Sequence, residues 1–108
     1  MTEDQIQAKI FKYYHNNFCL GENSNIIFSV PNGGFRTQRE AQTLKSTGTL
    51  AGVSDLIIIQ ENKTIFIEVK NSTGKQSPKQ ILFQKKVIDL GFNYHIVRTL
   101  EEFIKIME

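Results

Sequence analysis

The chain has 108 residues, 40% of them hydrophobic, a single cysteine and a formal net charge of +2 at pH 7. This length fits one domain with its own core, and one cysteine excludes an intrachain disulfide or a cysteine zinc cluster. The longest apolar run, 56–59, is far shorter than a membrane span, and the N-terminus lacks the basic and then apolar layout of a signal peptide. We therefore expect an intracellular globular protein.

Four helices are predicted from capping patterns. The segments 2–5, 37–40, 77–80 and 99–102 each place Ser or Thr three residues before Glu or Gln, which is the capping box that opens helices. Gly48 and Gly91 stand where C-terminal caps would end the second and third helices. We expect helices over about 3–18, 38–47, 78–90 and 100–107.

Between these helices lie four apolar runs that are typical of strands: Ile26–Val30, Asp55–Gln60, Thr64–Lys70 and Tyr94–Val97. The predicted order is therefore αβαββαβα. Crossovers between parallel strands place helices on the faces of a sheet. We predict a single α/β domain, residues 1–108, with a central mixed sheet flanked by helices.

In the first helix, Ile6 and Ile10 lie on one buried stripe, and Glu3 borders that stripe. A carboxylate at this position could reach the acidic end of the sheet. The alternative is that Glu3 complements the positive end of the helix dipole.

After the first predicted strand comes a loop, Val30-Pro-Asn-Gly-Gly-Phe-Arg36. Gly33 and Gly34 allow the backbone to bend sharply and to approach another surface closely. One interpretation is a loop whose amides, with Arg36, contact a nucleic-acid backbone. The other is a plain turn between a strand and a helix.

Positive charge is concentrated in two stretches. Between Glu68 and Asp89 there are five lysines and no acidic residue, and Arg36, Arg39 and Lys45 are opposed only by Glu40. The five are Lys70, Lys75, Lys79, Lys85 and Lys86. Such clusters favour binding of a polyanion, although two solvated helix faces would have the same composition.

The second and third strands form the predicted functional centre. If Gln60 pairs with Lys63 around a tight turn, Asp55 lies directly opposite Glu68, with Cβ atoms roughly 4.5–5.5 Å apart. Lys70 shares the face of Glu68, because side chains alternate along a strand. Buried acids are costly unless they pair or bind a cation. The pattern therefore predicts a metal site.

An acid entering one strand, followed by Glu68-Val-Lys70 at the end of the next, resembles the PD-(D/E)XK nuclease superfamily. A longer ordered series is similar to the VRR-NUC family, in particular its small stand-alone members encoded by phages. That series comprises Glu3 with Gln7, Pro31-Asn-Gly-Gly, Lys45-x-x-Gly48, Gly52-Val-Ser-Asp55 and Ser77-Pro-Lys-Gln80, and it extends to about Arg98. The family often has proline where this chain has Ser54. That position shapes the backbone rather than supplying a ligand.

The resemblance implies a restriction-endonuclease-like core that hydrolyses phosphodiester bonds with Mg²⁺ or Mn²⁺. Asp55, Glu68 and the backbone carbonyl of Val69 would be the metal ligands, and Glu3 would bind or orient a water of the metal. Hard oxygen ligands suit these ions.

Two further residues would complete the catalytic set. Lys70 would orient the attacking water and stabilise negative charge; an ion pair with Glu68 or Asp55 is the alternative. Gln80 corresponds to a glutamine that the family places near the active site, and it also completes a capping box.

The resemblance also implies DNA as the partner and the cytoplasm of a bacterium or of a phage-infected host as the location. The residues expected to bind DNA are Asn32, Gly33, Gly34, Arg36, Arg39, Lys45, Lys75 and Lys79. A four-way junction has two-fold symmetry, which a homodimer would match. We therefore expect a homodimer acting on branched DNA such as Holliday junctions. Flaps, nicked duplex, or DNA binding without catalysis are the alternatives.

Overall fold

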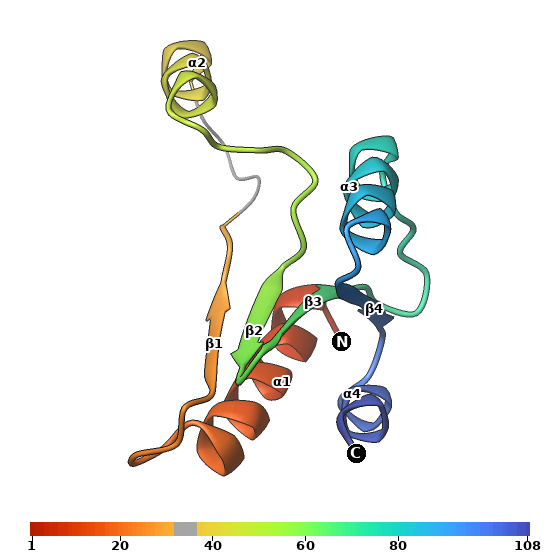
Figure 1. The fold of residues 1–108 in the computed structure, drawn as a ribbon. Helices are drawn as coiled ribbons and strands as arrows, with labels where there is room; N and C mark the ends of the chain where they lie inside the picture. The colour runs from red at the N-terminus through yellow and green to blue at the C-terminus, as the bar shows by residue number, and fades with distance from the viewer. Residues whose placement is uncertain (32–36) are drawn as a thin grey trace.

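All eight predicted elements are present in the computed structural model, which describes residues 1–31 and 37–108 (Figure 1). The helices are α1 (Glu3–Phe18), α2 (Gln38–Ser46), α3 (Pro78–Asp89) and α4 (Leu100–Met107). The strands are β1 (Ile26–Ser29), β2 (Leu56–Gln60), β3 (Lys63–Val69) and β4 (Asn93–Val97). Each end lies within one residue of its predicted position, and the α/β class and element order are confirmed.

The helices begin where the capping patterns predict. Thr2 and Ser77 form complete capping boxes, in which the side chains of Gln5 and Gln80 return to the N-cap backbone. The Thr99 hydroxyl accepts the Glu102 N–H at 3.1 Å, but Glu102 Oε1 accepts the N–H of Arg98, at 2.7 Å, rather than that of Thr99. Local capping thus marks the start of each helix.

The second and third helices end at glycines. Gly48 and Gly91 have φ of +107° and +91°, a conformation that glycine adopts without steric cost. The following amides return to the last turn: Thr49 N donates to the Leu44 carbonyl at 2.9 Å, and Phe92 N to the Val87 carbonyl at 3.1 Å. The predicted C-terminal caps are confirmed.

The sheet is mixed, with strand order β1-β2-β3-β4. β1, β2 and β3 are antiparallel neighbours, and β4 runs parallel to β3. Gln60 pairs with Lys63 and Leu56 with Ile67, which is the register that the sequence predicts. Asn62 lies in the turn with φ of 58°, a conformation that asparagine tolerates.

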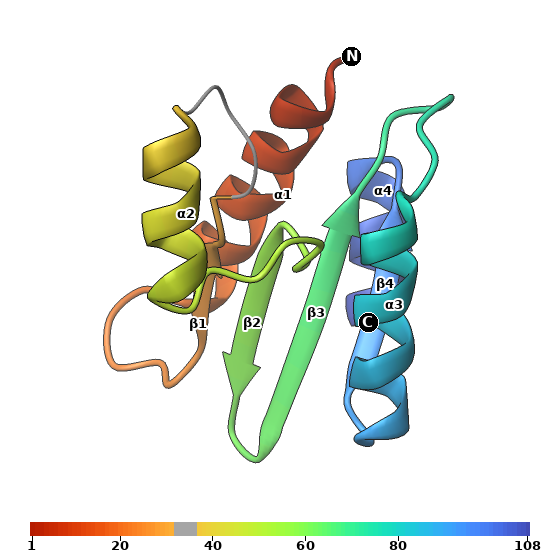
Figure 2. The ribbon, with the colours of Figure 1, turned by 90° about the horizontal axis from the view of Figure 1, so that it is seen from above.

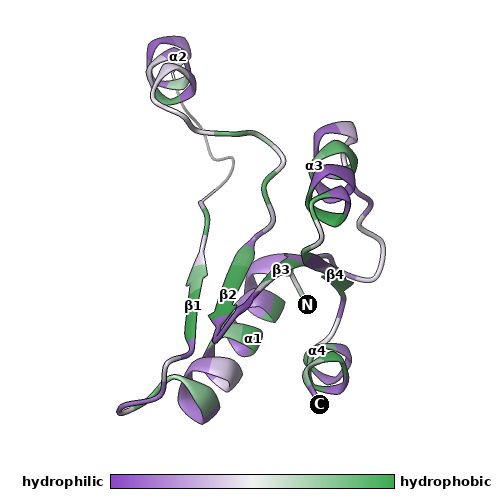
Figure 3. Ribbon diagram, viewed as in Figure 1, coloured by the Kyte–Doolittle hydropathy of each residue, from purple (hydrophilic) through white to green (hydrophobic). Residues whose placement is uncertain are grey.

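The helices cover the two faces of the sheet unequally. α1 and α4 lie on one face, and α3 lies on the other (Figures 1 and 2). The core is on the α1 and α4 side, and β1 and β2 are predominantly hydrophobic (Figure 3). Its fully buried members include Ile10, Tyr14, Leu56, Ile58, Ile67, Val97 and Phe103. Glu68 stands between the core residues Ile67 and Val69 on β3, so its side chain points to the α3 face.

Helix α2 stands away from the sheet, on the same side as α3 (Figure 1). None of its residues is buried. No helix in the described ranges combines the length and the apolar character needed to cross a membrane.

Candidate active site

Asp55 directly precedes β2, one residue outside the strand in which the sequence places it. Its Oδ2 accepts a hydrogen bond from the backbone N–H of Val69 at 2.7 Å. Because Leu56 pairs with Ile67, the same register places Asp55 opposite Glu68. The predicted juxtaposition of the two carboxylates across the antiparallel pair is thus present.

Burial raises the pKa of Asp55, the hydrogen bond from Val69 opposes that rise, and the charge of Glu68 adds to it. Lys70 lowers this pKa and Glu3 raises it, each to a smaller extent. The carboxylate of Asp55 therefore lies within the field of three other predicted site residues. An isolated acid here is costly in its ionised form, and a cation would relieve that cost.

Glu68 is completely buried, with an exposed fraction of 0%. Its Oε1 accepts hydrogen bonds from the Tyr94 hydroxyl and, at 3.4 Å, from the Gln76 amide. Its Oε2 is also buried, yet no donor from the described residues reaches it. A buried carboxylate oxygen without a partner is strongly unfavourable unless a ligand satisfies it.

Tyr94 and Gln76 hold Glu68 in place and were not predicted from the sequence. Tyr94 lies on β4, where it pairs with Phe66 of β3 on the α3 side of the sheet. Burial and the neighbouring Glu68 carboxylate raise the pKa of Tyr94, so its hydroxyl stays protonated and donates. Gln76 also donates to Gln84 Oε1 at 2.8 Å, which links Glu68 to α3. Two neutral donors thus fix one oxygen of Glu68 without cancelling its charge.

Lys70 is buried at the end of β3, and its Nζ donates to Gln80 Oε1 at 3.0 Å. The same oxygen accepts the Ser77 N–H at 2.8 Å. Gln80 therefore closes the capping box of α3 and also contacts Lys70. The alternative of a Lys70 ion pair is not seen, since the salt bridge found within the described residues joins Lys85 and Asp89.

Glu3 reaches the end of β3, as the position of its helix predicts. Its Oε2 accepts the Asn71 N–H at 3.3 Å. A Cβ added to Gly74 would lie 2.6 Å from that Oε2 and 3.3 Å from Cδ of Lys70. Glu3 and the Lys70 side chain therefore flank one glycine. Arg98, which the sequence did not single out for a role, fixes this turn by donating to the carbonyls of Asn71 at 2.6 Å and Gly74 at 2.9 Å.

Gly52 brings the segment before Asp55 against the start of α3. Its φ is +88°, and an added Cβ would lie 2.5 Å from the Lys79 carbonyl oxygen. Two residues later, Ser54 is fully buried, and its hydroxyl bonds locally to the Leu56 carbonyl at 3.3 Å. The approach at Gly52 couples the segment that carries Asp55, just before β2, to the helix that carries Gln80.

The donors of this site suit a hard divalent cation. Within the described residues, no group of three or more His, Cys, Asp or Glu side chains is arranged to hold a metal. Mg²⁺, however, usually takes one or two carboxylates and completes its shell with water and phosphate oxygens. Asp55 and Glu68 supply two carboxylates, and Glu68 Oε2 is a buried acceptor that has no donor in the described part of the chain.

The residues predicted to bind DNA fall into three groups. Lys75 and Lys79 are exposed, one in the turn after β3 and one on α3, beside Gln76 and Gln80. Arg39 and Lys45 are exposed on α2, the helix that stands away from the sheet (Figure 1). The remaining four, Asn32, Gly33, Gly34 and Arg36, lie outside the described residues.

A family model and two solved structures that resemble this chain all carry the same domain name. A family model described as the VRR-NUC domain matches residues 1–99. A solved structure named VRR_NUC domain protein has a TM-score of 0.77 and 20% identity, covering 99% of this chain and 85% of that one. A second, named VRR_NUC domain, has a TM-score of 0.67 and 17% identity, covering 99% and 96%. A search of curated proteins found no match.

Proposed function

The chain belongs to the VRR-NUC family of nucleases, and on this premise we propose that it is a Mg²⁺- or Mn²⁺-dependent endonuclease that cuts branched DNA. One observation carries the metal dependence. Glu68 is fully buried opposite Asp55, and its Oε2 has no hydrogen-bond donor among the described residues. A divalent cation satisfies such an oxygen and offsets the repulsion between the two acids.

In this proposal Asp55, Glu68 and the backbone carbonyl of Val69 hold the ion, and Glu3 orients a water beside it. The chemistry that a bound ion supplies is neutralisation of phosphate charge and a lower pKa for a water molecule. Tyr94 and Gln76 keep Oε1 of Glu68 occupied, so that Oε2 remains available. The protein thus fixes the ligand geometry in advance.

Lys70 is proposed to stabilise the negative charge that develops on the phosphate and to orient the attacking water. Its ammonium group is buried and anchored to Gln80 Oε1, so little reorganisation is needed when the reaction occurs. Such preorganised charge is often the largest catalytic contribution. Gln80 acts here as a positioning residue for Lys70.

The choice of substrate rests on symmetry. A chain of this size with one site cuts two strands only as a pair, and a two-fold dimer matches the two-fold symmetry of a four-way junction. We therefore propose a homodimer that acts on branched DNA, Holliday junctions above all. The cytoplasmic location expected from the sequence stays a prediction.

A cleavage panel tests this proposal. Synthetic four-way junctions, flaps, nicked duplex and linear duplex are incubated with the protein and Mg²⁺ or Mn²⁺, and the solution mass is measured. The expected result is preferential cutting of junctions by a dimer, abolished by Asp55→Ala and by a chelator. Cutting of linear duplex as fast as of junctions would contradict the junction proposal. Cutting by Asp55→Ala would contradict the assignment of the site.

A further inference from the structure

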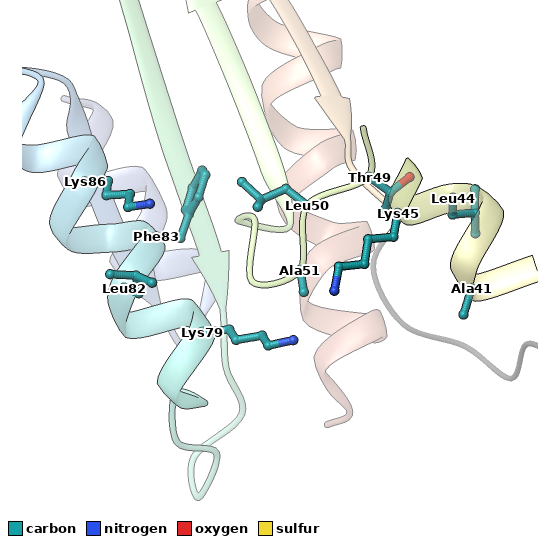
Figure 4. Close-up of a pocket in the computed structure, with 10 residues that line it drawn as sticks. All are labelled: Ala41, Leu44, Lys45, Thr49, Leu50, Ala51, Lys79, Leu82, Phe83 and Lys86. Atoms are coloured by element: carbon teal, nitrogen blue, oxygen red, sulfur yellow. The ribbon is translucent and has the colours of Figure 1, made fainter. Parts of the chain in front are cut away.

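A cavity of about 430 Å³ lies between α2 and α3, and none of the residues of the acidic site, Asp55, Glu68 and Lys70, lines it (Figure 4). Its walls come from α2, from the segment 49–51 and from the exposed face of α3. The apolar part includes Leu44, Leu50, Leu82 and Phe83. A volume in this range is large enough for a small ligand of mixed polarity.

Three lysines border the same cavity. Lys45, Lys79 and Lys86 extend into the space between the two helices (Figure 4). No acidic residue lines the cavity among the described residues, where Lys85 and Asp89 form the salt bridge that is present. An apolar interior with an uncompensated cationic rim matches a ligand that is flat and apolar in one part and anionic in another.

Phe83 presents a fixed aromatic ring to this space. On its other side it packs edge-on against Phe66 at 5.7 Å between ring centroids, and it lies 6.2 Å from Tyr94. A held aromatic ring beside lysines is the usual platform for an unpaired base, because every base has a face that can stack and a phosphate on each side.

The cavity adjoins the proposed catalytic residues. Lys79 is followed by Gln80, which binds Lys70, and Gly52 lies against the Lys79 carbonyl while its neighbour Ala51 lines the cavity. The cavity and Lys70 are therefore linked through adjacent residues of α3.

We propose that the cavity between α2 and α3 receives an unpaired nucleobase of the DNA strand being cut, with the three lysines on its flanking phosphates. This deepens the proposed nuclease function and rests on it. A base already unpaired at a branch enters at a lower unstacking cost than a base in duplex, which must first be unpaired and extruded. The cavity thereby favours DNA with unpaired positions. A second copy of this chain fits less well, since a two-fold contact through this surface would set lysines against lysines.

Two adjacent pairs of residues on α3 provide matched variants. Leu82 lines the cavity and Ile81 does not, yet their exposed fractions are 52% and 53%. Lys86 borders the cavity, and Lys85 does not. Truncation of an exposed side chain leaves the fold intact, so the Leu82 and Ile81 pair isolates the contribution of the cavity. Lys85→Ala controls for the loss of one positive charge on α3, and it also removes the ion pair with Asp89.

The experiment measures affinity by fluorescence anisotropy in EDTA, so that no cleavage occurs. The probes are a single strand of about 16 nucleotides and the same sequence as perfect duplex. We expect Leu82→Ala to weaken binding of the single strand about fivefold and of duplex much less, with no change in Ile81→Ala. Lys86→Ala should reduce the salt slope for the single strand by about 0.7, beyond any effect of Lys85→Ala.

Equal loss of single-strand and duplex affinity in Leu82→Ala, or no loss, would overturn the proposal. So would a change in solution mass in Leu82→Ala, which would show the cavity to be an interface between copies. Failure of the wild-type protein to cut any DNA would contradict the nuclease function instead, whatever the binding assay shows.

Discussion

The acidic site, made of Asp55, Glu68 and Lys70, and the α2–α3 cavity use charge in opposite ways. In the acidic site Glu68 and Lys70 are buried; Glu68 accepts a hydrogen bond from the Tyr94 hydroxyl, and Lys70 donates one to Gln80. The lysines that border the cavity are exposed. Its walls come from α2, which has no buried residue, from the segment 49–51 and from one face of α3.

This difference follows from what each region has to do. Buried, prearranged charge interacts strongly with a phosphate at the moment of reaction. Exposed lysines cost nothing to ionise, and they act through release of counterions from DNA. Substitutions in the acidic site should therefore change metal binding and turnover, whereas substitutions in the cavity and on α2 should change DNA affinity.

The largest effect among the following variants is expected for Lys70→Ala. Removing a preorganised charge next to the phosphate should slow single-turnover cleavage at saturating DNA and metal by about 10²–10³-fold. Gln80 Oε1 would keep its bond to the Ser77 N–H, so α3 should still start normally. Lys75→Ala, an exposed lysine in the next turn, is the control: it should weaken binding and leave the saturated rate unchanged. An equal decrease of the saturated cleavage rate in Lys70→Ala and Lys75→Ala would contradict the proposed difference between buried and exposed lysines.

A smaller effect is expected for Tyr94→Phe. Loss of a group that orients a metal ligand typically weakens metal binding about 10–100-fold, and this hydroxyl donates to Glu68 Oε1. Mn²⁺ affinity is measured by calorimetry, with thermal unfolding to verify the fold. Tyr13→Phe makes the same chemical change on the opposite face of the sheet, where the ring packs against Phe103. If both variants bind Mn²⁺ like wild type, Tyr94 does not position Glu68.

Gly74→Ala should slow cleavage because it displaces the carboxylate of Glu3. The added methyl group would lie 2.6 Å from Glu3 Oε2, and a flexible carboxylate yields by moving away. We expect about a tenfold loss in cleavage rate, since small displacements in an active site are costly. In a Glu3→Ala background the same change should have little further effect. Ser72→Ala, in the same turn, serves as the control, and additive losses in the double variant would contradict this coupling.

The smallest effect is expected for Arg39→Ala on α2. This exposed residue should contribute one phosphate contact, so its loss would lower DNA affinity a few-fold and reduce the salt slope for duplex by about 0.9. Binding is titrated at several salt concentrations, while the saturated rate and the unfolding temperature should not change. An unchanged affinity would mean that the charge on α2 is merely solvated.

Much of the acidic site could be predicted because its determinants are local. The tight turn after Gln60 sets the register of β2 and β3, which fixes Asp55 opposite Glu68. Capping boxes set the starts of α1 and α3, and these place Glu3 and Gln80. Short-range chemistry therefore determines most of the proposed ligands.

The supporting residues could not be predicted, because long-range pairing places them. Tyr94 meets Glu68 only through the parallel register of β3 and β4, and alternation along β4 alone does not reveal it. Gln76 and Arg98 act through a turn and through backbone carbonyls, which leave no sequence pattern. The cavity depends on how α2 lies relative to α3, and no local signal specifies that.

The central claim is that Asp55 and Glu68 together hold a divalent cation. Calorimetric titration of Mn²⁺ into the wild-type protein, Asp55→Asn and Glu68→Gln tests it most directly. Both substitutions keep the size of the side chain, and an amide oxygen can still accept the Val69 N–H. We predict saturable binding to the wild type and loss of that binding in each variant. Binding of equal affinity in all three proteins would contradict the account.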